Sequence, residues 1–163
     1  MKKFELTSEF VTNISGTKLF RIKALVEFGD VEAGELGGYI EKEENLDHDG
    51  NAWVYGDAQV CGNARVHGDA QVYGDAWVHG DARVCGDALV CGDADYAYAH
   101  GFGSVNRTTT FFRLKNGNVG VLCGCFHGTL QEFRDKIRET HGKTKKAQEY
   151  LMLADLMDFR FKN

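Results

Sequence analysis

The sequence predicts a mainly β fold built around a parallel β-helix, and three observations predict it. From Gly50 to Tyr96 the chain repeats every six residues, as in GDAQVYGDAWVH. In nearly every unit an alanine and a valine stand two residues apart, so both point to the same side of a short strand. Gly followed by Asp or Asn supplies turn chemistry at each junction. A fixed short period of this kind is typical of solenoids.

The N-terminal region is expected to cap this solenoid. Residues 19–28 (LFRIKALVEF) alternate apolar with mostly polar side chains, which is typical of a half-buried strand. Leu36 and Ile40 indicate an irregular first coil before the regular repeats begin. Because the open end of a β-helix exposes strand edges that invite polymerisation, we expect residues 1–35 to form a β cap.

The repeat is expected to form the solenoid proper, over residues 36–100. Three units per coil make a triangular prism of roughly four coils, with equivalent positions stacked about 4.8 Å apart. Outward side chains then form columns, and exposed aromatic columns usually mark a contact surface, here with a sister chain or with the chain's own termini. The aromatic residues predicted at this interface are Trp53, Tyr55, Tyr73 and Trp77.

The remaining residues, 101–163, are expected to form a small ββαα unit. Residues 108–114 and 119–126 are predicted strands joined at an Asn-Gly turn, which is a strong hairpin signal. Thr129, with a glutamate three residues later, forms a capping box that opens a helix ending at Gly142. A second helix is predicted over roughly residues 144–159.

Two resemblances extend these expectations. An aliphatic residue followed four residues later by a small one resembles the hexapeptide-repeat, left-handed parallel β-helix of the acyltransferase superfamily. Over nearly the whole chain, the lead-in LGGYIEKEENL, the repeat GNAWVYGDA and tail segments such as GFGSVNRTTTFFR and VLCGCFHGTLQEF resemble uncharacterised hexapeptide-repeat proteins of phages and prophages. The first resemblance implies a left-handed winding and a homotrimer. The second implies a phage or prophage origin but no agreed reaction.

The distribution of apolar and charged residues indicates where the protein is located and which kinds of partner it can bind. The chain has no apolar run long enough for a membrane span and its start lacks a signal-peptide core, so the expected location is the host-cell cytoplasm. Residues 41–100 hold 12 acidic and 3 basic residues, which argues against duplex nucleic acid as a partner. Residues 107–163 hold 11 basic and 6 acidic residues, either as an anion-binding surface or as a solvated helical face.

Cys61, Cys85 and Cys91 occupy outward positions and are expected to be reduced surface thiols.

The segment that joins the solenoid to the tail is the best candidate ligand site. Its glycines are expected to expose backbone N–H groups, its hydroxyls add further donors, and the arginine fork suits a phosphate. The alternative is a connector whose glycines serve a turn. Arg65 and Arg83, on the solenoid wall, are expected to contribute little. The residues predicted to contact an anion are Gly101, Gly103, Ser104, Arg107 and Thr108.

The sequence also contains residues that fit an enzyme and residues that fit a metal site. The hexapeptide resemblance implies a CoA-dependent acyltransferase, a trimer with a catalytic histidine at a subunit interface and a loop projecting from one coil. The candidates would be His67, His79 and His100, but units 51–94 carry no insertion that would enclose CoA or shield a general base. Cys123 and Cys125, which precede His127, share one side of the predicted strand at a spacing unusual for zinc, so small buried side chains are the preferred interpretation.

The leading hypothesis is therefore a non-catalytic phage or prophage binding protein, without metal or cofactor. It would capture a host protein or a small anionic, nucleotide-like ligand and so antagonise host antiviral defence. The acyltransferase is the second hypothesis and a structural assembly module the third.

Overall fold

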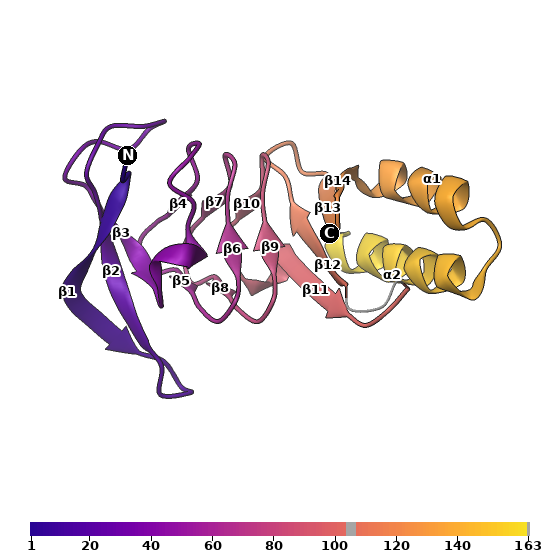
Figure 1. The fold of residues 1–163 in the computed structure, drawn as a ribbon, viewed down its shortest axis with the longest axis horizontal. Helices are drawn as coiled ribbons and strands as arrows, with labels where there is room; N and C mark the ends of the chain where they lie inside the picture. The colour runs from indigo at the N-terminus through magenta and orange to yellow at the C-terminus, as the bar shows by residue number, and fades with distance from the viewer. Residues whose placement is uncertain (104–106, 163) are drawn as a thin grey trace.

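The computed structural model describes residues 1–103 and 107–162 and shows an elongated, mainly β molecule with three parts in a row (Figure 1). N-terminal strands lie at one end, the repeat follows, and a sheet covered by two helices lies at the other end. Among the described residues, no helix is both long and apolar enough to cross a membrane.

The N-terminal cap continues one face of the solenoid. β1 (Phe4–Thr12) and β2 (Lys18–Ala24) form an antiparallel hairpin, and β2 pairs with β3 (Leu36–Ile40), which pairs in parallel with β5 of the repeat. The strand predicted over 19–28 is confirmed only as far as Ala24. β1 was not predicted, because most of its side chains are exposed or half-buried and only Phe4 is buried.

The repeat forms three stacked layers with an 18-residue period. Its two-residue strands are β4 (Trp53–Val54), β5 (Gln59–Val60), β6 (Arg65–Val66), β7 (Gln71–Val72), β8 (Trp77–Val78), β9 (Arg83–Val84) and β10 (Leu89–Val90). β6 pairs in parallel with β9, β5 with β8, and β4 and β10 both with β7. In the first, irregular layer a short 3-10 helix, η1 (Glu43–Asn45), replaces one strand, and Leu46 bridges to Val66.

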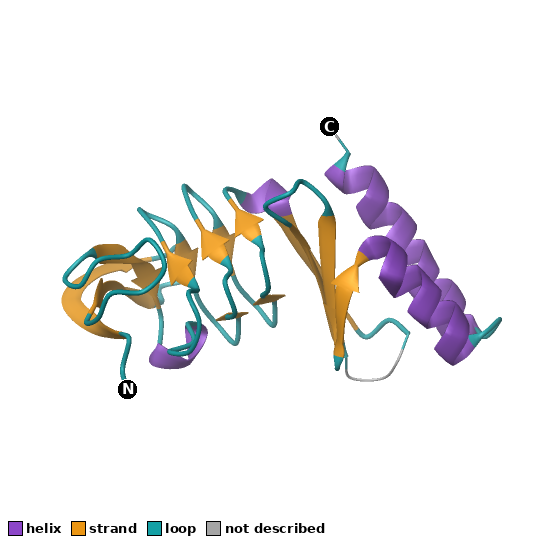
Figure 2. Ribbon diagram, turned by 90° about the horizontal axis from the view of Figure 1, so that it is seen from above, coloured by secondary structure: helices purple, strands orange, loops and turns teal. Residues whose placement is uncertain are grey.

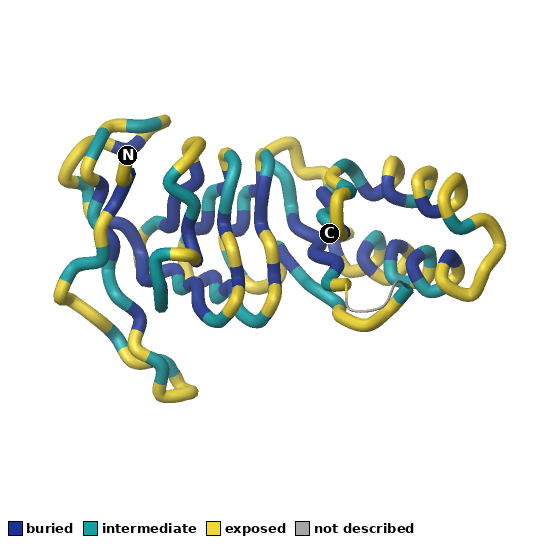
Figure 3. Tube along the Cα trace, viewed as in Figure 1, coloured by how far each residue is buried: buried dark blue, intermediate teal, exposed yellow. Residues whose placement is uncertain are grey.

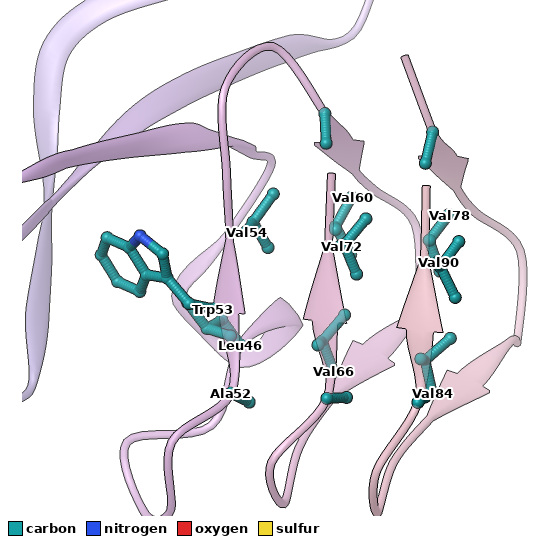
Figure 4. Close-up of a cluster of buried hydrophobic side chains, with 14 of the residues drawn as sticks. Leu46, Ala52, Trp53, Val54, Val60, Val66, Val72, Val78, Val84 and Val90 are labelled. Atoms are coloured by element: carbon teal, nitrogen blue, oxygen red, sulfur yellow. The ribbon is translucent and has the colours of Figure 1, made fainter. Parts of the chain in front are cut away.

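The predicted inner wall is confirmed (Figures 3 and 4). The seven repeat valines, from Val54 to Val90, are 0% exposed, and the alanines from Ala52 to Ala88 are at most 1% exposed. The last unit departs from the pattern, because a second 3-10 helix, η2 (Asp93–Asp95), leaves Ala94 exposed.

The corner glycines adopt the predicted conformation, with one exception. Positive φ angles of 58–68° occur at six of them, which are Gly56, Gly62, Gly68, Gly74, Gly80 and Gly86. At Gly74 an added Cβ would also lie 2.7 Å from the carbonyl oxygen of Cys91, so both the conformation and the space require glycine. Gly92 is extended, with φ −169°, where any residue fits.

The C-terminal sheet has four strands rather than the predicted two. β11 (Tyr96–His100), β12 (Thr108–Arg113), β13 (Val119–Cys123) and β14 (Phe126–Thr129) are antiparallel neighbours in chain order. The strand predicted over 119–126 is wrong as one piece, because the chain turns at Gly124, where φ is +59°. β11 was not predicted either.

Two helices cover one side of this sheet, and the solenoid lies against its other side (Figure 2). α1 (Leu130–His141) begins at the predicted capping box, and α2 (Lys145–Phe161) is capped by Thr144, whose side chain accepts from the Ala147 N–H. Phe111 packs with the helices while its neighbour Phe112 packs with the solenoid valines, as expected for alternating side chains of one strand. The sheet therefore covers the end of the solenoid.

Candidate functional site

Part of the predicted anion site comes together at the junction between the solenoid and the sheet. A hollow of about 420 Å³ lies there, which we call the junction hollow. It brings together two residues that were predicted to contact an anion, Arg107 and Thr108, with the candidate catalytic histidine His100. Arg83, which was not expected there, also lines it. The complete lining is Asn63, Asp81, Arg83, His100, Arg107, Thr108, Leu122 and Gly124.

Backbone contacts hold the two arginines in place. The Arg83 N–H donates to Oγ1 of Thr110 at 3.0 Å, which fixes β9 against β12. The Arg107 carbonyl accepts from the Gly101 N–H at 3.2 Å, which closes the base of the connector. The Arg107 side chain lies over the turn at Gly124, where an added Cβ would be 1.8 Å from Nη1. Glycine at 124 therefore makes room for the guanidinium.

The charges that line the hollow favour an anion. Arg83 and Arg107 are exposed, and neither forms an ion pair with any other described residue. Nδ1 of His100 lies 2.8 Å from Oγ1 of Thr108. Asp81 supplies the one carboxylate of the lining, and Nδ2 of Asn63 donates to it at 3.4 Å. The lining thus carries two guanidinium groups and one carboxylate, which gives it a net positive charge.

The glycines do not play the predicted role. The Gly101 N–H already donates to the carbonyl of Arg107, and the Gly103 N–H donates to Oε1 of Glu149 at 3.0 Å. An added Cβ at Gly103 would meet the ring of Tyr150 at 2.1 Å, so this glycine allows close packing. The prediction that these N–H groups face a ligand is therefore wrong. Ser104 lies outside the described residues.

The prediction for Arg83 also needs correction. Its place in the repeat indicates a solenoid wall far from the connector, and the sequence carries no signal that β12 packs beside β9. The two strands are nevertheless in contact. Arg65, one layer away on the same face, does not line the hollow and remains a wall residue.

Two comparisons with known proteins bear on the solenoid. Residues 58–74 and 70–86 match the family model for the YdcK β-solenoid repeat. The chain therefore contains a β-solenoid repeat. It is also 40% identical over 62 residues to the uncharacterized acetyltransferase YdcK of Escherichia coli strain K12. That match covers 34% of this chain and 19% of the E. coli protein, so the chain spans about one fifth of that relative's length.

The three candidate catalytic histidines of this β-solenoid lie apart. His67 is half-buried on the β6–β9 face, and burial is the main cause that lowers its pKa, opposed by the charge of Asp47. His79 packs against Trp77 with ring centroids 4.6 Å apart. Of the three, His100 alone lines the junction hollow.

The cysteine predictions are partly wrong. Cys61 and Cys85 are buried rather than on the surface, while Cys91 is exposed. Cys123 and Cys125 do not share a strand face, because β13 ends at Cys123, which is buried, and Cys125 is exposed beyond the turn. No cluster of potential metal ligands occurs among the described residues.

The aromatic columns have two different surroundings. Trp53 is 0% exposed and packs under the N-terminal cap, 5.2 Å from the ring of Phe28. Of the two predicted contacts for this residue, a sister chain or the chain's own termini, the structure shows the second. Tyr55 and Tyr73 are half-buried and stack at 4.2 Å. Trp77 is half-buried and donates from Nε1 to the Cys61 sulfur at 3.1 Å.

Proposed function

We propose that this β-solenoid protein binds a small anionic ligand in the junction hollow. The observation that carries the proposal is the convergence of Arg83 and Arg107 on one hollow, two guanidinium groups that form no ion pair within the part of the chain that the structure describes. Guanidinium groups recognise phosphate and carboxylate through paired N–H donors. A volume of about 420 Å³ suits a small molecule, since such sites typically measure about 300–1,000 Å³.

Calorimetric titration with inorganic phosphate, AMP, cyclic AMP and coenzyme A tests the proposal. Arg107→Ala and Arg83→Ala should each weaken binding about tenfold or more, because hydrogen bonds to charged groups contribute about 1.5–3 kcal/mol. Arg65→Ala is the matched control, since it removes the same charge one layer away and should leave binding unchanged. The proposal fails if no probe binds, or if Arg65→Ala weakens binding as much as the other two variants.

An acetyltransferase is the second candidate, and the name of the E. coli relative favours it. His67, His79 and His100 would then be tested as general bases. Release of free CoA from acetyl-CoA in the presence of amine and hydroxyl acceptors would be measured for the wild type and for each histidine-to-alanine variant. Turnover that one of these variants abolishes would favour the enzyme over a binding protein.

The wider biological setting is part of the proposal. The resemblance to phage and prophage hexapeptide-repeat proteins supports a left-handed winding and a role inside a bacterial host, where capture of a host ligand or protein would blunt antiviral defence. Expression of the wild type in a phage-resistant host should then restore infection. The Arg83→Ala/Arg107→Ala double variant should not restore infection. If the wild type and the double variant restore infection equally, the role in defence does not depend on the junction hollow.

A further inference from the structure

The outward face of α2 carries a row of exposed apolar side chains. Met152 is 71% exposed, Leu156 55% and Phe159 78%. Their spacing of four and then three residues places them on one face of the helix. The opposite face, which includes Tyr150 and Ala154, is buried against α1 and the sheet. α2 is therefore apolar on both sides, although only one side is covered by the described chain.

A hollow lies beside this row. Its volume is about 420 Å³, and it is lined by Phe102, Glu149, Met152, Leu153 and Leu156. Phe102 is itself 49% exposed. Phe159 lies further along the helix, about 10 Å beyond Met152 at 1.5 Å per residue. The helix thus presents a protruding ring at one end of the row and a hollow toward the other.

We propose that α2 packs antiparallel against α2 of a second copy of this chain, about a twofold axis near residues 154–155. In this arrangement Phe159 of each copy lies opposite the 149–152 region of the other and fills its hollow. The same patch meets itself, which is the requirement of a twofold interface. The proposed assembly is a dimer, whereas the sequence resemblance implies a homotrimer.

The charges along the row support the antiparallel orientation. Glu149 and Arg160 flank the apolar row on the same side, about three turns apart. Neither forms an ion pair with a described residue; Glu149 accepts the Gly103 N–H, and Arg160 donates a 3.4 Å hydrogen bond to the Asp93 carbonyl. Antiparallel packing brings Glu149 of each copy to Arg160 of the other.

The contact near the twofold axis is also electrostatically acceptable. Asp155 lies close to the axis, so the two copies would bring two carboxylates together. Within each chain, Nη2 of Arg134 already pairs with this carboxylate at 2.9 Å. The same nitrogen lies 3.8 Å from the carboxylate of Asp158. Four apolar side chains of this surface, Phe102, Met152, Leu156 and Phe159, are 49–78% exposed. Pairing of two copies would remove this apolar surface from water.

Light scattering coupled to size-exclusion chromatography tests the pairing on the full chain at micromolar concentrations. The wild type should have twice the mass of the 18.1 kDa chain. Leu156→Glu should weaken association about tenfold or more, because it places a charge in the centre of the apolar row. Leu36→Glu is the matched control, because Leu36 has a similar exposure of 53% on β3 and should leave the dimer intact.

A charge exchange separates this contact from general surface effects. Glu149→Arg and Arg160→Glu should each weaken the dimer, and the double exchange should restore it. Circular dichroism of each variant verifies that α2 is still folded. A monomeric or trimeric wild type, equal dissociation by Leu36→Glu, or a double exchange that does not restore the dimer would each overturn the proposal.

Discussion

The inward side chains of the solenoid leave no room for a polar group. Val72 is 0% exposed and lies between Val54 and Val90 of the adjoining layers. Its neighbour Gln71 points outward and is only half-buried. A carboxylate at residue 72 would be removed from water without a partner, whereas one at residue 71 would stay hydrated.

We therefore expect Val72→Asp to lower the free energy of unfolding by about 3 kcal/mol or more. Gln71→Glu adds the same charge on the outer face and should change stability by less than about 0.5 kcal/mol. Urea denaturation of both variants measures the difference. Equal losses would contradict the assignment of inner and outer faces.

Lys3 gives the cap a pH dependence. Its ammonium group donates to the Ala52 carbonyl at 2.8 Å, its residue is 3% exposed, and burial lowers its pKa from 10.5 to about 8. Between pH 8 and pH 10.5 the unfolded chain therefore binds more protons at this side chain than the folded chain. The contribution of Lys3 to stability consequently rises with pH across this window.

The comparison with Lys3→Met isolates this effect from other groups that titrate at high pH. The stability of the wild type relative to Lys3→Met should increase by up to about 3 kcal/mol from below pH 8 to above pH 10.5. Denaturation curves at the two ends of the window supply the measurement. A difference that stays constant, or that falls, would show that the ammonium group is not desolvated as described.

At the scale of elements, the corners determine the path of the repeat. Gly74→Ala should cost about 1 kcal/mol or more, because φ is +63° and the new Cβ would press on the Cys91 carbonyl. Gly92→Ala is the matched control, since Gly92 is extended and has nothing within 4 Å of the added Cβ. Thermal melting compares them, and equal effects would reject the account of the corners.

Elements with strong local signals were predictable, and elements that depend on distant pairing were not. The Ala/Val alternation specified the inner wall, and Thr129 with Glu132 specified the start of α1. β1 carries few buried side chains, so its strand character comes from pairing with β2. β14 was not predicted as a separate strand, because the sequence pattern continues through Gly124, where the positive φ turns the chain between β13 and β14.

At the scale of the whole molecule, the candidate site exists because the terminal sheet covers the end of the solenoid. Arg107 was predictable, since it lies in a connector rich in glycine and hydroxyl groups. Arg83 was not, because its role depends on contact between β9 and β12, which are distant in sequence. The same packing engages the N–H groups of the connector glycines, leaving the arginine side chains as the charged donors at the junction hollow.

A crystal structure of the protein grown with AMP tests the central claim most directly. The account predicts density for the phosphate in the junction hollow, within hydrogen-bond distance of the guanidinium groups of both Arg83 and Arg107. Phosphate density elsewhere on the molecule, or an empty hollow in which Asp81 pairs with these arginines, would contradict it.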